Sequence, residues 1–269
     1  MISVKNLPGT AACSVEAPAA LFNLKGTCAV ITGAASGIGQ MMAVGLAAAG
    51  ARCALLDIAD TGQTRKLIEE NGGSAESFFC DLAAAAETAE PLFSTIHSRF
   101  GSIDILVNCG GITFRSPAMD YPLEAFQNVL DINLTAVFLL SQIAARYMKE
   151  QGGGHIINMA SALSFQGGMF VPGYTASKGG VAQLTKALAN EWARYNINVN
   201  AIAPGYIDTA LNTAVIQDPE RNRQVLDRLP CARWGKPEDF IGTVIFLSSP
   251  ASAYITGHVL CVDGGYQSR

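Results

Sequence analysis

The amino-acid sequence predicts a single α/β domain with a doubly wound parallel sheet of about seven strands and helices on both faces. Two observations lead to this fold class: short apolar runs alternate with longer helical patterns, and no linker or internal repeat divides the 269 residues. Several of the runs are apolar throughout, as expected of parallel strands that are covered on both faces. Repeated strand–helix alternation then gives right-handed crossovers within one sheet.

The expected elements follow one another along the chain. Residues 1–22, which contain Pro8 and Pro18, are expected to form a flexible leader, and residues 23–269 form the folded domain. A helical pattern at 37–49 follows the first strand. Each expected strand is a short run rich in apolar or β-branched residues. These runs lie at 28–32, 52–57, 77–80, 105–108, 155–159, 198–203 and 259–262.

Composition excludes several kinds of partner. The formal net charge is −4 at pH 7, and no dense run of Lys or Arg occurs, so a nucleic-acid partner is not expected. The seven cysteines are odd in number and include no C-x-x-C pair, which favours free thiols in a reducing compartment. The start of the chain lacks the apolar stretch of a secretory signal or membrane helix. We therefore expect a cytoplasmic protein with no membrane partner.

Metal and hydrolase chemistry are not indicated. The three histidines, at 97, 155 and 258, have neither metal-ligand spacing nor a nucleophile partner. No G-x-S-x-G motif occurs, because two alanines precede Ser36. The sequence therefore predicts no metal site.

A glycine-rich turn, T-G-A-A-S-G-I-G, ends the first strand and opens the following helix at residues 32–39. Glycines allow a tight turn and a close approach of the backbone to a pyrophosphate, which then binds at the helix N-terminus. This arrangement is typical of a Rossmann-like dinucleotide-binding domain. The predicted cofactor contacts in the turn are Gly33, Ser36, Gly37, Ile38 and Gly39.

Asp57 ends the second strand, roughly twenty residues beyond the turn, where an acid can accept both ribose hydroxyls of adenosine. A 2′-phosphate at this place would meet a like charge. No Arg or Lys stands in the turn, and Ile58 follows Asp57. The sequence therefore favours NAD as the cofactor over NADP.

A serine after the fifth expected strand precedes a Tyr-x-x-x-Lys pair; these residues are Ser161, Tyr174 and Lys178. Tyr and Lys four positions apart lie on one face of a helix. A phenol has a pKa near 10, but a nearby ammonium and an oxidised nicotinamide favour the phenolate. Lowering this pKa by about 3 units takes roughly 4 kcal/mol, which two close positive charges can provide. We therefore predict hydride transfer with Tyr174 as the acid/base.

Together with the glycine-rich turn, Ser161, Tyr174 and Lys178 make the sequence resemble the short-chain dehydrogenase/reductase family over residues 24–269. The resemblance implies that Ser161 binds the substrate oxygen and Lys178 the nicotinamide ribose. It implies that Asn133 places a water that links Lys178 to solvent. The further cofactor contacts that it implies are Tyr174, Asp81, Leu82, Asn108, Gly110, Pro204, Gly205, Ile207 and Thr209.

The resemblance also implies a homotetramer, formed through the helix before Tyr174, the helix that begins there, and the C-terminal strand. One departure from the family pattern is visible. Residues 108–111 read Asn-Cys-Gly-Gly, where the family usually has Asn-Asn-Ala-Gly. The backbone role of this segment is expected to survive the change.

In the second half, residues 163–168 (L-S-F-Q-G-G), 190–192 (N-E-W), 196–206 and 233–235 (R-W-G) are similar to one branch of the family, whose members are dehydrogenases of deoxygluconates and deoxy-ketogluconates. This resemblance implies that the protein interconverts a secondary alcohol and a ketone on a sugar acid of the deoxy-ketogluconate or gluconate type. Arg115, in the loop after the fourth strand, suits the carboxylate of such a small-molecule substrate. Gln166 and Tyr206 are further candidates for substrate contacts.

Residues 206–228 are rich in Asn, Asp and Gln and are expected to form a lid that excludes water during transfer; the alternative is a surface helix pair. Other functions stay open. The protein could be a polyol or sugar dehydrogenase, or another carbonyl reductase of the same family. A non-catalytic NAD-binding protein is also possible, although it should lack part of the Ser–Tyr–Lys set.

Overall fold

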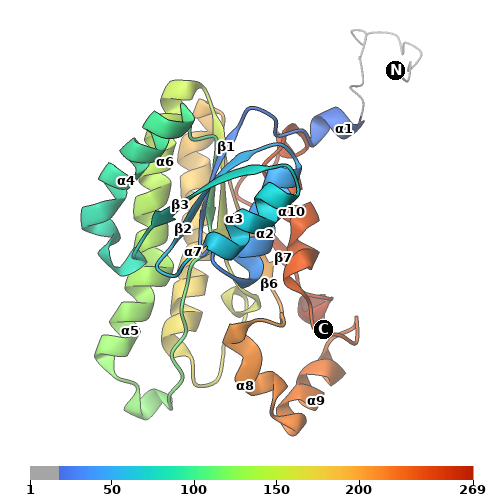
Figure 1. Cartoon of the computed structure of the whole chain (residues 1–269). Helices are drawn as coiled ribbons and strands as arrows, with labels where there is room; N and C mark the ends of the chain where they lie inside the picture. Colours follow the sequence, from blue (N-terminus) through green and yellow to red (C-terminus); the bar gives the residue numbers. More distant parts are fainter. Residues whose placement is uncertain (1–17, 269) are drawn as a thin grey trace, which may run out of the picture.

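The computed structural model describes residues 18–268 and confirms the predicted fold class (Figure 1). Within these residues, one parallel sheet has the strand order β3-β2-β1-β4-β5-β6-β7. The order reverses between β1 and β4, so the crevice that parallel sheets use for ligands opens at the carboxyl ends of these two strands. The strands are β1 (Cys28–Thr32), β2 (Arg52–Asp57), β3 (Ser74–Phe79), β4 (Ile105–Asn108), β5 (Gly154–Met159), β6 (Ile197–Pro204) and β7 (Val259–Val262).

Helices cover both faces of the sheet (Figure 1). One layer contains α4 (Ala85–Phe100), α6 (Ala136–Gln151) and α7 (Pro172–Trp192), and the other contains α2 (Gly37–Ala48), α3 (Gly62–Glu70) and α10 (Ile241–Leu247). Strand β1 shows why the central runs are apolar throughout. Val30 packs into the core under the first layer and Ile31 into the core under the second, and both are fully buried.

The edge strand β3 differs from its prediction. It begins at Ser74 and ends at Phe79, whereas the sequence predicted 77–80. An edge strand is covered on fewer sides, and the residues of β3 alternate between buried and exposed. The apolar signal was therefore confined to the end of the strand.

One long helical run is interrupted by a π-turn. Helix α5 (Leu123–Leu130) continues through Asp131–Thr135 into α6, and the π-turn contains Asn133. Among the described residues this run, Leu123–Gln151, is the one helix that is long and apolar enough by composition to span a membrane. Half of its apolar window is buried inside the fold, which accounts for its hydropathy.

The predicted lid segment forms two short helices, α8 (Thr213–Ile216) and α9 (Pro219–Arg228). They lie together at the carboxyl end of the sheet, in orange in Figure 1. Val225 and Leu229 are buried in a small cluster with Tyr266 from the C-terminal segment. This cluster fixes α9 against the rest of the chain.

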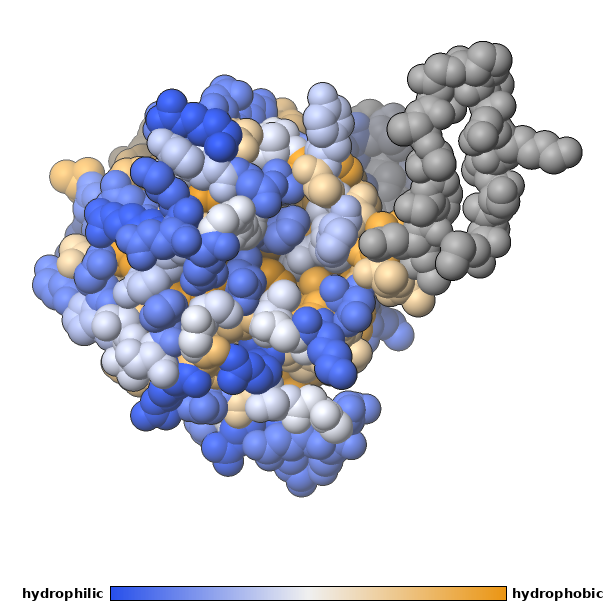
Figure 2. Space-filling view, turned by 90° about the horizontal axis from the view of Figure 1, so that it is seen from above, coloured by the Kyte–Doolittle hydropathy of each residue, from blue (hydrophilic) through white to orange (hydrophobic). Residues whose placement is uncertain are grey.

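At the opposite end of the molecule the surface is mainly formed by hydrophilic residues, and hydrophobic residues show between them (Figure 2). Residues 1–17 of the predicted leader lie outside the described residues. The part of the leader that is described contains the short helix α1 (Pro18–Leu21).

Candidate functional site

A cavity of about 600 Å³ lies among the segments that follow β4, β5 and β6. Ser161, Tyr174 and Lys178 all line it. The structure therefore brings together the three residues predicted to carry the chemistry. The other predicted residues that line the cavity are Ile38, Arg115, Gln166, Pro204, Gly205, Tyr206, Ile207 and Thr209.

The start of α7 positions Tyr174 and Lys178. Pro172 is the first residue of the helix, where its fixed φ suits the helix and its missing N–H costs no hydrogen bond. Tyr174 therefore falls in the first turn, and Lys178 lies one turn later and is buried. A hydrogen bond joins the Tyr174 hydroxyl to Ser161. Ser161 itself begins a short 3₁₀ turn, and its Oγ accepts a hydrogen bond from the Leu163 N–H at 3.1 Å.

The Lys178 ammonium is directed toward the main chain of β5. Its Nζ donates to the Met159 carbonyl at 2.6 Å and lies 5.6 Å from the centre of the Tyr174 ring. Burial lowers the pKa of Lys178 to about 8. The same burial raises the pKa of Tyr174, while the hydrogen bond from Ser161 acts in the opposite direction.

These directions apply to the chain without a cofactor. The sequence analysis expected a nearby ammonium and an oxidised nicotinamide together to favour the phenolate; in the chain alone, burial outweighs the hydrogen bond from Ser161 and raises the pKa of Tyr174. The physical reason is that a dry environment disfavours the charged form of both groups. The positive charge of an oxidised nicotinamide would act in the opposite direction to burial.

Asn133 holds the loop after β4 beside α7. Its Oδ1 accepts from the Ile112 N–H at 2.8 Å, and its Nδ2 donates to the Ile112 carbonyl at 2.8 Å and to Ser177 Oγ at 3.2 Å. A Cβ on Gly111 would lie 3.0 Å from Asn133 Oδ1 and 3.8 Å from Lys178 Nζ. Asn133 thus positions the backbone next to Lys178, and its predicted water remains a prediction.

The glycine-rich turn is packed too closely for side chains. Gly33 has a φ of +67°, and a Cβ there would lie 2.8 Å from the Gly110 Cα. A Cβ on Gly39 would lie 2.1 Å from the Gly33 carbonyl oxygen. Ser36 is the N-cap residue of α2, but its side chain accepts no hydrogen bond from the helix. The first N–H groups of α2 are therefore not capped by Ser36. A cradle of bare backbone at a helix N-terminus fits a pyrophosphate.

Thr32 joins the two strands that flank the crevice. Its Oγ1 accepts hydrogen bonds from the N–H groups of Cys109 and Gly110, each at 3.0 Å. A Cβ on Gly110 would lie 2.6 Å from Leu82 Cδ1, which explains why glycine suits the place where the family usually has alanine. The Cys109 side chain lines the cavity, and burial raises the pKa of its thiol to about 12.

Asp57 is fixed at the end of β2 beside the glycine-rich turn. Its Oδ2 accepts from the Ala35 N–H and its Oδ1 from the Ala59 N–H, both at 2.9 Å. Ile58 is 65% exposed. The carboxylate is therefore oriented by the same turn that would hold a pyrophosphate.

The remaining predicted residues do not line the cavity. They are Gly33, Ser36, Gly37, Gly39, Asp57, Ile58, Asp81, Leu82, Asn108, Gly110 and Asn133. Asn108 differs most from expectation. Its buried Nδ2 donates to Ser141 Oγ at 3.0 Å and to Asn158 Oδ1 at 2.9 Å, so its side chain links β4 to β5 and α6. Asp81 caps the turn Leu82–Ala84 through the Ala83 N–H at 2.9 Å.

The sequence analysis missed one wall of the cavity. It is formed by α9 and the C-terminal segment, through Arg221, Gln224, Val225, Arg228 and Tyr266. The first four are spaced by three, four and seven residues, which is the signal of one helix face. Tyr266 gave no local signal, because its place in the wall depends on a contact between distant parts of the chain.

The charged residues that line the cavity are all basic. Arg115, Lys178, Arg221 and Arg228 line it, and no Asp or Glu of the described residues does. Within residues 18–268 no cluster of His, Cys, Asp and Glu could hold a metal ion. The wall therefore favours an anionic small molecule.

Comparisons with known proteins agree with this geometry. The family model described as "Enoyl-(Acyl carrier protein) reductase" matches residues 33–267. The chain is 48% identical over 257 residues to the 2-dehydro-3-deoxy-D-gluconate 5-dehydrogenase of Bacillus subtilis, covering 92% of this chain and 97% of that protein. It is 44% identical over 249 residues to the Escherichia coli protein of the same name, covering 92% and 98%.

A solved structure is also similar over nearly the whole chain. It is the gluconate 5-dehydrogenase of Burkholderia cenocepacia in complex with NADP and tartrate. The TM-score is 0.89 at 36% identity, covering 93% of this chain and 99% of that one.

Proposed function

Because this chain belongs to the short-chain dehydrogenase/reductase family, we propose that it oxidises and reduces a sugar acid at a secondary alcohol carbon. The observation that carries the proposal is the cavity. Ser161, Tyr174 and Lys178 line it together with three arginines, and no carboxylate among the described residues lines it. Guanidinium groups suit carboxylates, whereas a neutral polyol gains little from them. The names of the similar proteins support the same substrate class.

The chain has the features that a nicotinamide dinucleotide requires. The backbone cradle at Gly33 and Gly39 fits a pyrophosphate, and Asp57 stands where the adenosine ribose would lie. Ile207 and Thr209 line the cavity, where the backbone near Ile207 and the hydroxyl of Thr209 would contact the nicotinamide carboxamide. When bound, the nicotinamide accepts or gives the hydride.

The residues of the chain provide the proton and the orientation. Ser161 and Tyr174 share a hydrogen bond, so a substrate oxygen between them can be held by both hydroxyls. Tyr174 gives its proton to that oxygen during ketone reduction and takes it back during alcohol oxidation. Lys178, anchored on the Met159 carbonyl, holds its ammonium in the same dry region. Helices α8 and α9 limit the access of water.

Steady-state kinetics with a substrate panel tests the proposal. The panel contains 2-dehydro-3-deoxy-D-gluconate, 5-keto-D-gluconate, D-gluconate and neutral pentitols, each with both nicotinamide cofactors. We expect kcat/KM for the best sugar acid to exceed that for every neutral polyol by at least about tenfold, the factor that 1.4 kcal/mol gives. A polyol as the best substrate would contradict the proposal. Tight NADH binding without any turnover would favour a non-catalytic binding protein.

We further propose that NAD is preferred over NADP. The support is the carboxylate of Asp57, which two N–H groups fix at the end of β2, together with the apolar Ile58 after it. A 2′-phosphate near this carboxylate would be repelled, and repulsion between close charges near a surface reaches a few kcal/mol. The similar Burkholderia structure contains NADP, so the preference has to be measured on this chain.

Replacing Asp57 tests the cofactor preference. We expect Asp57→Asn to lower the ratio of kcat/KM for NAD⁺ to that for NADP⁺ by at least about tenfold, because the repulsion of the phosphate is removed. Asp60→Asn, in the same loop, is the matched control and should leave the ratio unchanged. A wild-type enzyme that prefers NADP⁺ would show that the proposal is wrong.

A further inference from the structure

Helix α9 presents two faces with opposite electrostatic character. Arg221, Gln224, Val225 and Arg228 line the cavity and fall on one face by their spacing. Their neighbours in sequence point elsewhere. The helix therefore separates arginines that face the cavity from arginines that do not.

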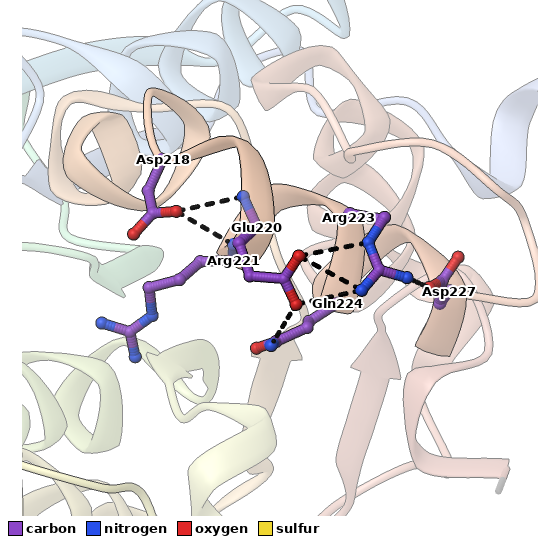
Figure 3. Close-up of polar contacts among 6 residues, drawn as sticks. All are labelled: Asp218, Glu220, Arg221, Arg223, Gln224 and Asp227. Carbon is purple, nitrogen blue, oxygen red and sulfur yellow. Dashed lines mark hydrogen bonds and ion pairs between the residues drawn. The ribbon is translucent and has the colours of Figure 1, made fainter.

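The outer face neutralises its own charge. Arg223 Nη2 lies 2.9 Å from Glu220 Oε1, and Arg223 Nη1 lies 3.1 Å from Asp227 Oδ2 (Figure 3). Gln224 Nε2 also donates to Glu220 Oε1 at 2.9 Å. Both acids thus pair with Arg223, and neither lines the cavity. No negative charge of α9 is left to balance its inner face.

The two inner arginines differ in their contacts. Arg228 Nη2 donates to Gln166 Oε1 at 3.0 Å, and its guanidinium lies 4.2 Å from the centre of the Tyr266 ring. These contacts tie α9 to the loop after β5 and to the C-terminal segment. Arg228 is therefore already engaged in holding the helix in place.

Arg221 has no such contact. Among residues 18–268 its guanidinium makes no hydrogen bond and no ion pair, and Figure 3 shows it pointing away from Arg223 and its acids. Asp218, the N-cap residue of α9, caps the helix. Its Oδ1 accepts hydrogen bonds from the N–H groups of Glu220 and Arg221, each at 3.1 Å. Arg221 thus offers a full set of guanidinium donors at the cavity wall.

We propose that Arg221 binds the carboxylate of the substrate and so selects sugar acids over neutral sugars. This inference rests on the proposed function. In a sugar acid the reacting carbinol and the carboxylate are several carbon–carbon bonds apart, so the cation must lie away from Tyr174. Lys178 cannot serve, because it is buried and bound to the Met159 carbonyl. Arg221 can place its guanidinium away from Tyr174, on a helix that the buried Val225 packs against the rest of the chain.

Arg115 is the rival for this role. It lines the same cavity from the loop after β4, and its side chain also makes no hydrogen bond or ion pair with the described residues. It lies outside any helix or strand, whereas Arg221 lies on a helix that Arg228 holds in place. Rigid elements position a binding group more accurately than loops do, which favours Arg221 as the anchor.

The test compares substrates that differ only in charge. These are the sugar acid with the highest kcat/KM in the panel and its primary carboxamide. We expect Arg221→Gln to raise KM for the acid about 10- to 100-fold, as the loss of a charge-assisted pair predicts. KM for the carboxamide and kcat for both should stay within about threefold, because the pair is made equally in the ground and transition states.

Two further variants separate charge from structure. Arg221→Lys should recover part of the affinity for the acid, since it restores the charge without the bidentate geometry. Arg223→Gln, on the outer face of the same helix, is the matched control and should leave both KM values unchanged. NADH affinity and the thermal midpoint should be the same in all variants, because none of these residues is assigned to the cofactor.

The outcomes distinguish the inference from the proposed function. If the wild-type enzyme uses acid and carboxamide equally well, both are wrong. If the wild type prefers the acid and Arg221→Gln keeps that preference, only the inference is overturned. A loss of the preference in Arg115→Gln alone would move the anchor to the loop after β4. An equal loss of kcat for both substrates in Arg221→Gln would show a role in lid structure and overturn the inference as well.

Discussion

At the scale of single residues, Tyr174 and Lys178 of the proposed active site are held in conditions that favour the neutral form of each. Burial raises the pKa of the phenol and lowers that of the ammonium to about 8. Alcohol oxidation nevertheless needs the phenolate as a base. The positive nicotinamide of an oxidised cofactor would add the missing charge, so cofactor binding and proton release by Tyr174 should be coupled.

Tyr174→Phe removes the only proton donor that the mechanism uses. We expect kcat to fall by a factor of about 10² to 10⁴, the usual size of general acid–base catalysis. NADH affinity, followed by fluorescence titration, and the thermal midpoint should be unchanged, since the ring that packs in the site is retained. Turnover at the wild-type rate with intact folding and NADH binding would show that the assigned mechanism is wrong.

Lys178 should make stability depend on pH in a defined direction. Its pKa is about 8 in the folded chain, below the ordinary lysine value of 10.5, so the unfolded state holds the extra proton between these values. Stability therefore rises with pH across this window, and below pH 8 the buried charge is a standing cost.

The variant Lys178→Met lacks this titration. Relative to the variant, the wild type should gain about 1–2 kcal/mol in free energy of unfolding between pH 8 and pH 9.5. Urea unfolding of both proteins without cofactor measures the difference, and the other titrating groups cancel because both proteins share them. A difference that is constant with pH would show that the pKa of Lys178 is normal in the folded state.

At the scale of elements, the turn between β1 and α2 is specified by glycine. An alanine at Gly33 would keep a φ of +67° and bring its Cβ within 2.8 Å of the Gly110 backbone. We expect Gly33→Ala to lower the free energy of unfolding by about 2–4 kcal/mol, from backbone strain and overpacking together.

A second glycine provides the control. Gly242 lies in α10, and a Cβ there would meet nothing within 4 Å. Gly242→Ala should therefore raise the free energy of unfolding by about 0.5–1 kcal/mol through helix propensity alone. Urea denaturation measures both variants. Equal effects of the two substitutions would contradict the close packing at Gly33.

The same scale shows what the sequence could predict of the fold. Strands β1, β2, β4 and β7 lie where they were expected, because short apolar runs bounded by polar turns are typical of such strands. The position of β3 was wrong by three residues at its start, since an edge strand is only half apolar. The helix predicted at 37–49 is observed as α2 (Gly37–Ala48), which follows the glycine-rich turn.

The site was predictable where spacing in the sequence carries the geometry. Tyr174 and Lys178 share a helix face by their separation alone, and Ser161 follows a recognisable strand. The direction of the pKa of Tyr174 was not predictable, because it depends on how far the site is buried. Arg221 was missed, although its helical spacing was readable, since only the folded chain shows which face of α9 meets the cavity.

At the scale of the whole molecule, the sheet order brings together residues from distant parts of the chain. The carboxyl ends of β4, β5 and β6 supply one side of the cavity, and α9 and Tyr266 supply the other. The cationic lining is therefore a property of the fold, since Arg115 is far in sequence from the two arginines of α9. A cytoplasmic location stays a prediction from the sequence.

The homotetramer also remains a prediction, and β7 offers a way to test it. Strand β7 pairs with β6 and forms one edge of the sheet within the described chain. Its residues are Val-Leu-Cys-Val, with Cys261 exposed, and it carries no charge. Exposed edges of monomers usually carry charged residues that prevent pairing, so an uncharged edge is consistent with cover by another subunit.

Introducing a charge at this edge should therefore disrupt the assembly. Light scattering during size-exclusion chromatography should give the mass of four chains for the wild type and a smaller assembly for Cys261→Lys, because a lysine at the interface would have to be desolvated without a partner. Ser74→Lys, on the exposed opposite edge at β3, is the control and should remain tetrameric. A monomeric wild type would end the prediction of a homotetramer. A tetramer that tolerates Cys261→Lys would place its interfaces away from β7, on the helices that precede and contain Tyr174.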